Sequence, residues 1–203
     1  MTTRSAVIFD LGGVLIDWNP RYLYRKIFAD ETGIDRFLSE TGLLAWNEQM
    51  DAGRPFAEAV EELSAEFPHY AEPIAAFHQR WIEMVGGAIE PTVAVLRKLK
   101  DLRYPVHALS NWSAETFPLA QERFDFLHWF DDAVISGRHG IIKPDPRIFE
   151  LLLSRTGLRA KECIYIDDSE KNVRQASIMG FRAVHFTGDL NLHASLKELG
   201  VKL

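Results

Sequence analysis

Five short segments of the chain are almost entirely apolar, and they constrain its fold more than any other feature of the sequence. A strand that faces solvent on one side alternates apolar and polar residues, whereas a strand covered on both faces is apolar throughout. The segments therefore predict the buried strands of a parallel sheet. They cover Ala6–Phe9, Val106–Leu109, Ala133–Ile135, Cys163–Ile166 and Ala183–Phe186.

Helical patterns separate the later strands. Gly157 and Gly180 follow the last two of these helices, at the position where a left-handed residue ends a helix. The predicted helices cover Thr92–Asp101, Ser113–Arg123, Pro146–Thr156 and Glu170–Met179. Strands that alternate with helices are connected by right-handed crossovers, which place helices over the sheet. We therefore predict an α/β fold with a Rossmann-like parallel sheet and helices on both faces.

Residues 17–85 interrupt this alternation. The stretch contains no convincing strand, and its apolar residues recur at the spacing of one helix face. Two such series are Phe56, Ala59, Val60, Leu63 and Phe67, and Ile74, Phe77, Trp81, Met84 and Val85. We expect an all-helical cap formed by residues 17–85, inserted after the first strand of a Rossmann-like core formed by residues 1–16 and 86–203.

Composition restricts the partners of the chain. Its 203 residues include 23 basic and 29 acidic side chains, a net charge of −6, which argues against nonspecific nucleic-acid binding. Cys163 is the single cysteine and lies in a predicted buried strand, so we expect an inert thiol and no intrachain disulfide. The apolar stretch at residues 6–16 is interrupted by Asp10 and does not resemble a signal peptide, and no segment approaches the ~20 apolar residues of a membrane span. We expect a cytoplasmic protein without nucleic-acid or membrane partners.

Polar residues follow four of the predicted strands. Ligands bind at the carboxyl ends of the strands in open parallel sheets, so these residues should meet at one edge. They are Asp10, Ser110 with Asn111, Lys143, and Asp167 with Asp168 and Asn172. Each alone has a simpler explanation as a turn residue, a helix cap or a solvated charge. Their occurrence at corresponding strand ends is not explained in that way.

Three carboxylates that converge repel one another unless a cation lies between them. Magnesium binds through a few carboxylates together with substrate oxygens. Lys143 would then supply a fixed positive charge for an anionic substrate, and Ser110 or Asn111 a hydrogen bond. Such a set suits phosphoryl transfer, in which positioning and charge neutralisation provide most of the catalysis.

These residues resemble the four motifs of the haloacid dehalogenase superfamily, and the resemblance covers essentially the whole chain. The motifs are Phe9-Asp10-Leu11-Gly12-Gly13-Val14, Leu109-Ser110-Asn111, the segment from Gly140 to Phe149 that contains Lys143, and Tyr165-Ile166-Asp167-Asp168 with Asn172. The resemblance implies a Mg2+-dependent phosphohydrolase that acts on a small phosphorylated metabolite, with a helical cap that closes over the site.

The resemblance also implies a role for each matching residue. Asp10 would be the nucleophile that forms an aspartyl-phosphate, and Lys143 would bridge the phosphate and Asp10. Ser110 and Asn111 would contact the phosphate. Magnesium would be held by Asp10, the backbone carbonyl of Gly12 and Asp168, with Asp167 and Asn172 in support. Trp112, directly after Asn111, is a further candidate for the substrate pocket.

Gly12 departs from the usual pattern of the superfamily, which has a second Asp here as general acid and base. General acid–base help is worth ~100- to 10,000-fold, and poor leaving groups need it most. Within the superfamily, the chain most resembles the group of the bacterial α-D-glucose-1-phosphate phosphatases and the epoxide hydrolase N-terminal-like phosphatases. The glucose-1-phosphate phosphatases also carry a glycine at this position. A sugar 1-phosphate has a better leaving group than an ordinary alkoxide. If another residue supplies the proton, Asp17, Glu48 and Asp51 are the first candidates.

Three alternatives remain open. A 2-haloacid dehalogenase would use Asp10 to displace halide without a metal, but Asp167 and Asp168 would then have no purpose. A phosphomutase would need the acid–base Asp that Gly12 replaces. A catalytically weakened member would bind a phosphate or a partner without turnover. The chain is expected to be a monomer or a homodimer.

Overall fold

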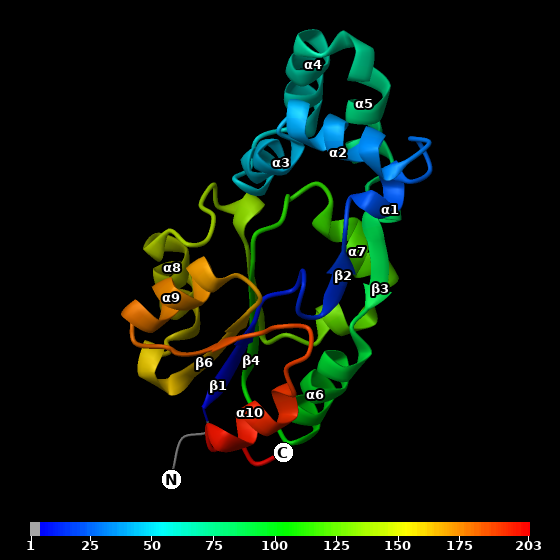
Figure 1. Cartoon of the computed structure of the whole chain (residues 1–203). Helices are drawn as coiled ribbons and strands as arrows, with labels where there is room; N and C mark the ends of the chain where they lie inside the picture. Colours follow the sequence, from blue (N-terminus) through cyan, green and yellow to red (C-terminus); the bar gives the residue numbers. More distant parts are fainter. Residues whose placement is uncertain (1–4) are drawn as a thin grey trace.

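The computed structural model of the chain describes residues 5–203 and contains a five-stranded parallel sheet with helices on both faces (Figure 1). The strand order is β5-β4-β1-β6-β7, so the first strand lies at the centre. The strands are β1 (Ala6–Phe9), β4 (Val106–Ser110), β5 (Asp132–Ile135), β6 (Cys163–Asp167) and β7 (Arg182–His185). The predicted fold class is confirmed, and each predicted strand lies within two residues of an observed one.

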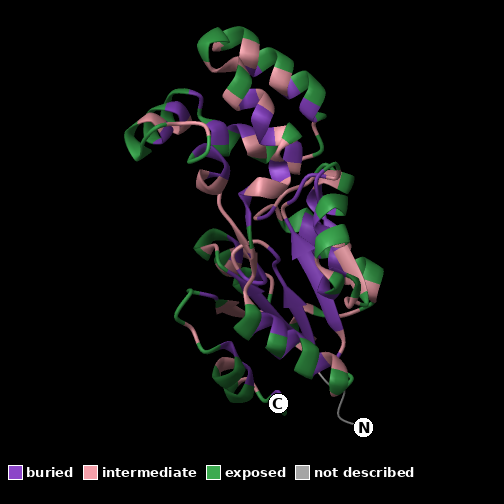
Figure 2. Ribbon diagram, turned by 90° about the vertical axis from the view of Figure 1, so that its right-hand side faces the viewer, coloured by how far each residue is buried: buried purple, intermediate pink, exposed green. Residues whose placement is uncertain are grey.

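The central strand shows why the sheet needs helices on both sides. Along β1, Ala6 and Ile8 pack in one apolar cluster and Val7 and Phe9 in another, and all four side chains are fully buried. Figure 2 shows the buried strands between helices whose outer faces are exposed. The core helices are α6 (Glu90–Asp101), α7 (Phe117–Arg123), α8 (Pro146–Thr156), α9 (Glu170–Ile178) and α10 (Leu192–Glu198), with short 3-10 turns η3 (Asp125–His128), η4 (Ser136–Arg138) and η5 (Ala160–Glu162).

A group of helices stands above the carboxyl ends of the strands (Figure 1) and is called the cap below. It comprises α1 (Arg21–Tyr24), α2 (Glu31–Glu40), α3 (Leu43–Asp51), α4 (Phe56–Glu66) and α5 (Ala71–Gln79), with the 3-10 turns η1 (Pro68–Tyr70) and η2 (Trp81–Met84). Aromatic packing fills its interior. Trp46 lies edge-on to Phe77 at 5.5 Å and to Phe56 at 6.0 Å between ring centroids.

The expectation of no strand between residues 17 and 85 is wrong at both ends of the stretch. The chain enters the cap through β2 (Ile16–Trp18) and leaves it through β3 (Val85–Ala88), and the two strands form an antiparallel pair. Asp17 in β2 and Gly86 and Gly87 in β3 break the apolar pattern on which strand prediction depends. The helical spacing from Ile74 to Val85 is likewise divided, because α5 ends at Gln79 and η2 follows.

Two further differences concern helix boundaries. The helix predicted from Ser113 begins at Phe117, since residues 114–116 form a turn next to the site. Helix α10 follows the last strand and was not predicted. Within residues 5–203, no helix has the length and apolar character needed to cross a bilayer.

Candidate active site

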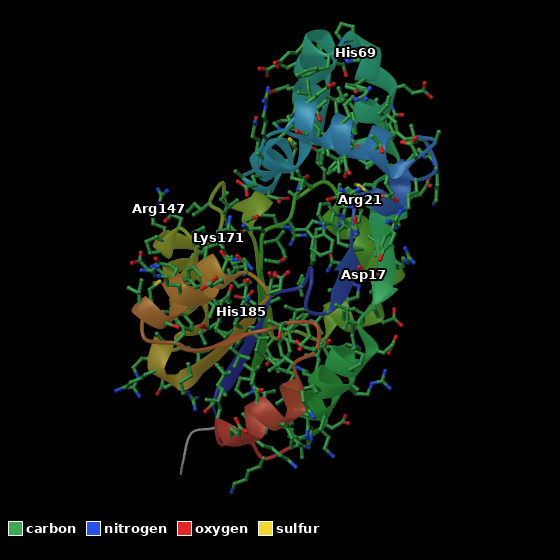
Figure 3. The ribbon with its side chains drawn as sticks, in the orientation of Figure 1. Asp17, Arg21, His69, Arg147, Lys171 and His185 are labelled. Carbon is green, nitrogen blue, oxygen red and sulfur yellow. The ribbon has the colours of Figure 1, made fainter. Side chains whose placement is uncertain are left out.

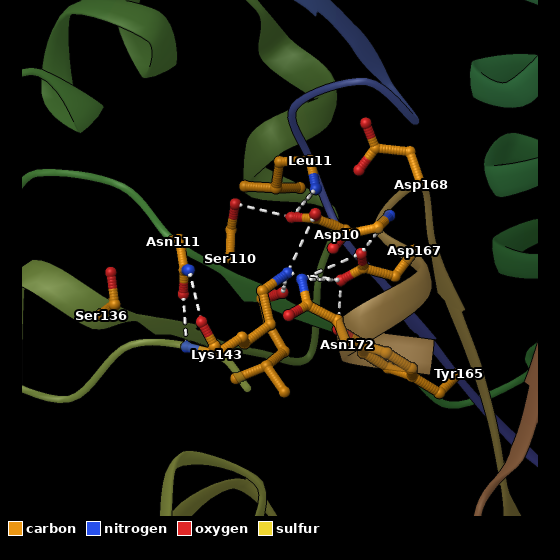
Figure 4. Close-up of polar contacts among 12 residues, drawn as sticks. Asp10, Leu11, Ser110, Asn111, Ser136, Lys143, Tyr165, Asp167, Asp168 and Asn172 are labelled. Atoms are coloured by element: carbon orange, nitrogen blue, oxygen red, sulfur yellow. Dashed lines mark hydrogen bonds and ion pairs between the residues drawn. The ribbon is translucent and has the colours of Figure 1, made fainter. Parts of the chain in front are cut away.

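The carboxyl ends of β1, β4 and β6 bring the predicted residues together (Figure 4). Asp10 follows β1 directly and is only 7% exposed. Its Oδ1 accepts hydrogen bonds from the backbone N–H of Leu11 at 2.7 Å and from the Ser110 hydroxyl at 2.8 Å. These two donors fix one carboxylate oxygen and leave Oδ2 to face Lys143.

Lys143 lies at the centre of the polar network and its side chain is 1% exposed. Its Nζ is 2.9 Å from Asp10 Oδ2, 2.7 Å from Asp167 Oδ2 and 2.9 Å from the carbonyl oxygen of Leu109. Burial disfavours the ammonium charge, but the attraction of the two carboxylates outweighs it and raises the pKa of Lys143. The lysine is therefore a permanent positive charge between two carboxylates.

Asp10 and Asp167 respond differently to this environment. Burial raises the pKa of Asp10 to about 7, against the opposing attraction of Lys143. Burial acts on Asp167 in the same direction, but Lys143 and hydrogen bonds from Tyr165 and the backbone N–H of Ser169 lower the pKa of Asp167 overall. Asp167 thus stays ionised and organises the lysine.

Asp10, Asp167 and Asp168 form an acidic cluster in which one carboxylate oxygen from each lies within 4.8 Å of the others. Asn172 Nδ2 donates to both oxygens of Asp167, at 3.0 and 3.2 Å, while its buried Oδ1 has no hydrogen-bond partner in the described part of the chain. Oxygen donors and an unsatisfied amide oxygen fit a hard divalent cation with bound water. Asp168 is exposed, and its carboxylate receives no side-chain hydrogen bond within residues 5–203. It is therefore better placed than Asp167 for direct coordination.

The side chain of Asn111 holds the backbone of Lys143 in place. Its Oδ1 accepts from the Lys143 backbone N–H at 2.7 Å, and its Nδ2 donates to the Lys143 carbonyl at 3.0 Å. The amide thereby fixes the backbone that carries the central ammonium. The predicted phosphate contact of Asn111 therefore competes with a structural role, although the residue also lines the cavity.

A cavity of about 250 Å3 lies between the acidic cluster and the cap. It is lined by Asp10, Gly12, Gly13, Trp18, Asn47, Asp51, Trp81, Ser110, Asn111, Trp112, Thr116 and Asp168. Trp81 and Trp112 lie 5.4 Å apart between ring centroids, and Trp112 Nε1 donates to Thr116 Oγ1 at 3.2 Å. The cap therefore provides part of the wall of the cavity, and Trp112 lines the same cavity from the core.

The two glycines after Asp10 differ in the space around them. At Gly12, an added Cβ would have no heavy atom within 4 Å among residues 5–203, apart from its chain neighbours. At Gly13, whose φ is +70°, the same atom would lie 2.1 Å from Asp168 Oδ2. Gly13 is thus required by backbone conformation and by the approach of Asp168, whereas Gly12 leaves open space.

Several residues of the site were not predicted from the sequence. Ser136 in η4 accepts from the Trp112 backbone N–H at 2.9 Å and donates to the Asp51 carbonyl at 2.6 Å. Asn47 was not predicted, and it lies four residues before Asp51, a candidate proton donor from the sequence, on the same face of α3. Only the packed structure shows that this face meets the cavity. Trp18 and Trp81 also line the cavity, whereas Trp46 packs inside the cap.

Two known phosphatases are similar in sequence to this chain over most of its length. A sesquiterpene phosphatase from Aspergillus oryzae is 30% identical over 98% of this chain and 97% of its own length. A glyceraldehyde 3-phosphate phosphatase from Methanopyrus kandleri is 25% identical over 89% of this chain and 82% of its own. Among solved structures, an HAD family enzyme from Bacteroides thetaiotaomicron has a TM-score of 0.76 and 20% identity over 95% of this chain and 98% of its own.

An L-2-haloacid dehalogenase from Xanthobacter autotrophicus shares the fold with a TM-score of 0.66 and 16% identity, over 98% of this chain and 83% of its own. The sequence profile of the haloacid dehalogenase-like hydrolases matches residues 5–180, which include Asp10, Ser110, Lys143 and Asp168. This match covers most of the chain and includes the residues that meet at the sheet edge. The chain therefore belongs to the haloacid dehalogenase-like hydrolase family.

Proposed function

We propose that the protein is a Mg2+-dependent phosphatase of small organic phosphate monoesters and that Asp10 is its nucleophile. The observation that carries the proposal is the convergence of Asp10, Lys143, Asp167 and Asp168 beside the cavity, with carboxylate oxygens within 4.8 Å of one another. The Bacteroides thetaiotaomicron neighbour has been solved in complex with magnesium and inorganic phosphate. The relatives named above are described as phosphatases.

Asp10 is prepared for attack on phosphorus. Leu11 N–H and Ser110 Oγ fix Oδ1, and the Lys143 ammonium lies 2.9 Å from Oδ2. This arrangement restricts the rotation of the carboxylate and partly balances the charge that a phosphate would bring next to it. Attack by Asp10 forms an aspartyl-phosphate, which water then hydrolyses.

The acidic cluster would hold the metal. Asp10, Asp168 and the backbone carbonyl of Gly12 would bind Mg2+ directly, with Asp167 and Asn172 in support. When bound, the ion supplies positive charge to the phosphoryl oxygens. Ser110, whose hydroxyl reaches Asp10, and Asn111 would lie beside the phosphate.

The cavity favours two substrate classes. Sugar 1-phosphates are the class that the glycine at position 12 favours if no other residue supplies a proton, because their leaving group needs less protonation than an ordinary alkoxide. The wall formed by Trp18, Trp81 and Trp112 favours a second class, phosphates with a hydrophobic organic group, and the 30% identical relative is named a sesquiterpene phosphatase. We further propose that the enzyme is cytoplasmic, is a monomer or a homodimer, and acts on small metabolites.

A direct test is hydrolysis of p-nitrophenyl phosphate with Mg2+ and after treatment with EDTA. We expect turnover that EDTA abolishes and Mg2+ restores, because the acidic cluster needs a cation beside a phosphate. Chloride release from 2-chloropropionate in metal-free buffer, without phosphatase activity, would contradict the proposal and identify a dehalogenase. Parallel assays of sugar 1-phosphates and prenyl phosphates then separate the two substrate classes.

A further inference from the structure

The site has a gap where the proposed reaction needs a proton. When the P–O bond of an alkyl phosphate breaks, the leaving oxygen needs a proton, and the water that hydrolyses the aspartyl-phosphate must lose one. Gly12, which lines the cavity next to Asp10, has no side chain to do this, and the space beside its Cα is open. A proton donor must therefore come from another part of the cavity wall.

Asp51 supplies a carboxyl group to the same wall from the cap. It is the last residue of α3 and lines the cavity together with Asp10. Its carboxylate accepts from Asn47 Nδ2 at 3.2 Å and from the backbone N–H of Ser113. Its carbonyl accepts from the Ser136 hydroxyl at 2.6 Å. Contacts to both the cap and the core thus hold the carboxyl group in place.

The other two acidic candidates from the sequence point elsewhere. Asp17 lies on β2 (Figure 3), where its Oδ2 accepts from the Tyr22 hydroxyl at 2.7 Å. Glu48 is exposed and lies 3.6 Å from the ammonium of Lys171 on α9. Neither belongs to the described residues that line the cavity.

We propose that Asp51 is the general acid and base of this enzyme and replaces the carboxylate that Gly12 lacks; this inference rests on the proposed phosphatase function. In the first step, Asp10 attacks phosphorus, the P–O bond breaks, and the leaving oxygen takes the proton of the Asp51 carboxyl. In the second step, water attacks phosphorus and gives its proton to the Asp51 carboxylate. Asp10 and inorganic phosphate are released, and Asp51 is protonated again.

The protonation of Asp51 suits this role. Burial raises the pKa of Asp51 to about 7, Glu48 acts in the same direction, and the Ser113 N–H and Lys143 oppose them. A carboxyl group with a pKa near the working pH is available in both forms, which is the most effective condition for acid–base catalysis.

The test is the dependence of kcat/KM on the leaving group in the full-length protein. For Asp51→Asn, we expect kcat/KM for a primary alkyl phosphate to fall ~100- to 10,000-fold, while that for p-nitrophenyl phosphate stays close to the wild-type value. Asparagine keeps the hydrogen-bonding shape but has no proton to give. Asp17→Asn is the matched control, since it makes the same substitution at a carboxylate of β2 that does not line the cavity and does not act on the pKa of Asp51.

Two further measurements exclude a merely structural role. Asp51→Asn should release one equivalent of p-nitrophenolate in a burst and then turn over slowly, because the second step has lost its base. Adding Gly12→Asp to Asp51→Asn should recover the alkyl phosphate activity, because the space at position 12 accepts a side chain. Asp51→Ala should reproduce the steep leaving-group dependence if the Asn variant is unstable.

The outcomes separate the inference from the function on which it rests. An active wild type whose leaving-group dependence is unchanged by Asp51→Asn would overturn the role of Asp51 and leave the phosphatase intact. An equal loss for alkyl and aryl phosphates in kcat/KM, without a burst, would also overturn it and indicate a packing role. A wild type that hydrolyses no phosphate ester with Mg2+ would overturn both.

Discussion

The Nζ of Lys143 lies 2.9 Å from Oδ2 of Asp10, and both side chains are almost completely shielded from water. A buried lysine with a single buried aspartate could form a neutral pair. Here Asp167 is a second carboxylate at 2.7 Å from the same nitrogen, and the exposed Asp168 follows it in the chain. The site therefore has excess negative charge, and this excess is the physical reason to expect a cation.

Asp10→Asn should abolish phosphatase activity while the fold persists. Asparagine keeps the shape of the side chain but is not a nucleophile toward phosphorus, so added Mg2+ should not restore turnover. Steady-state assays over a range of Mg2+ concentrations, with circular dichroism as the check on folding, measure this. Substantial residual activity would place the nucleophile elsewhere.

Asp168→Asn should instead weaken the response to metal. The substitution removes one charged ligand but leaves Asp10 and Lys143 in place, so a higher Mg2+ concentration should recover part of the activity. The measurement is the Mg2+ concentration at half-maximal rate, compared with that of the wild type. An unchanged value would show that Asp168 is not a ligand.

Lys143→Met should destabilise the metal-free protein strongly. Removal of the ammonium leaves Asp10 and Asp167 buried without their counter-charge, and breaking a buried ion pair in this way costs about 3–5 kcal/mol. Lys100→Met is the matched control, because Lys100 and Asp131 form a partly exposed pair, for which we expect a loss below about 1 kcal/mol. Urea unfolding of both variants measures the difference. Equal losses would contradict the central role of Lys143.

Gly12 and Gly13 should tolerate substitution very differently. Gly12→Ala should leave folding and Mg2+ dependence nearly unchanged, because its Cβ meets open space. Gly13→Ala places a Cβ 2.1 Å from Asp168 Oδ2 at a positive φ, so both the loop and the carboxylate must shift. The stability and the Mg2+ response of both variants can be compared directly. A Gly13→Ala variant with normal Mg2+ response would contradict this reading of the loop.

The difference in stability between Asp51→Asn and the wild type should change with pH in a defined direction. The folded-state pKa of Asp51 is raised to about 7 from an ordinary value of 3.8, so the folded state binds the proton more tightly than the unfolded state. The contribution of Asp51 to the free energy of unfolding is then largest below pH 4 and decreases as pH rises through 7. Asparagine does not titrate. The free energy of unfolding of the variant, relative to that of the wild type, should therefore increase between pH 5 and pH 8, by an amount on the order of a few kcal/mol at most. Thermal unfolding of the two proteins at both pH values measures this, and a constant difference would contradict the raised pKa.

The sequence was sufficient for the sheet and for the residues at its edge, because both depend on local patterns. Runs such as Ala6–Phe9 are apolar throughout, and Asp10, Ser110 and Asp167 stand at the ends of such runs. The cap side of the cavity could not be predicted in this way. The contact between Asp51 and Ser136 joins residues 85 positions apart, and it depends on how α3 packs against η4.

The short antiparallel pair of β2 and β3 was also missed, and it is the two-stranded connection through which the chain enters and leaves the cap. Trp18 is the last residue of β2 and at the same time part of the cavity wall. An organic group bound beside Trp18 would therefore contact the connection between cap and core directly. A larger group there would limit how far the cap could move toward the core about this pair. The size of the substrate would then act on the connection between cap and core, at a distance from the phosphate.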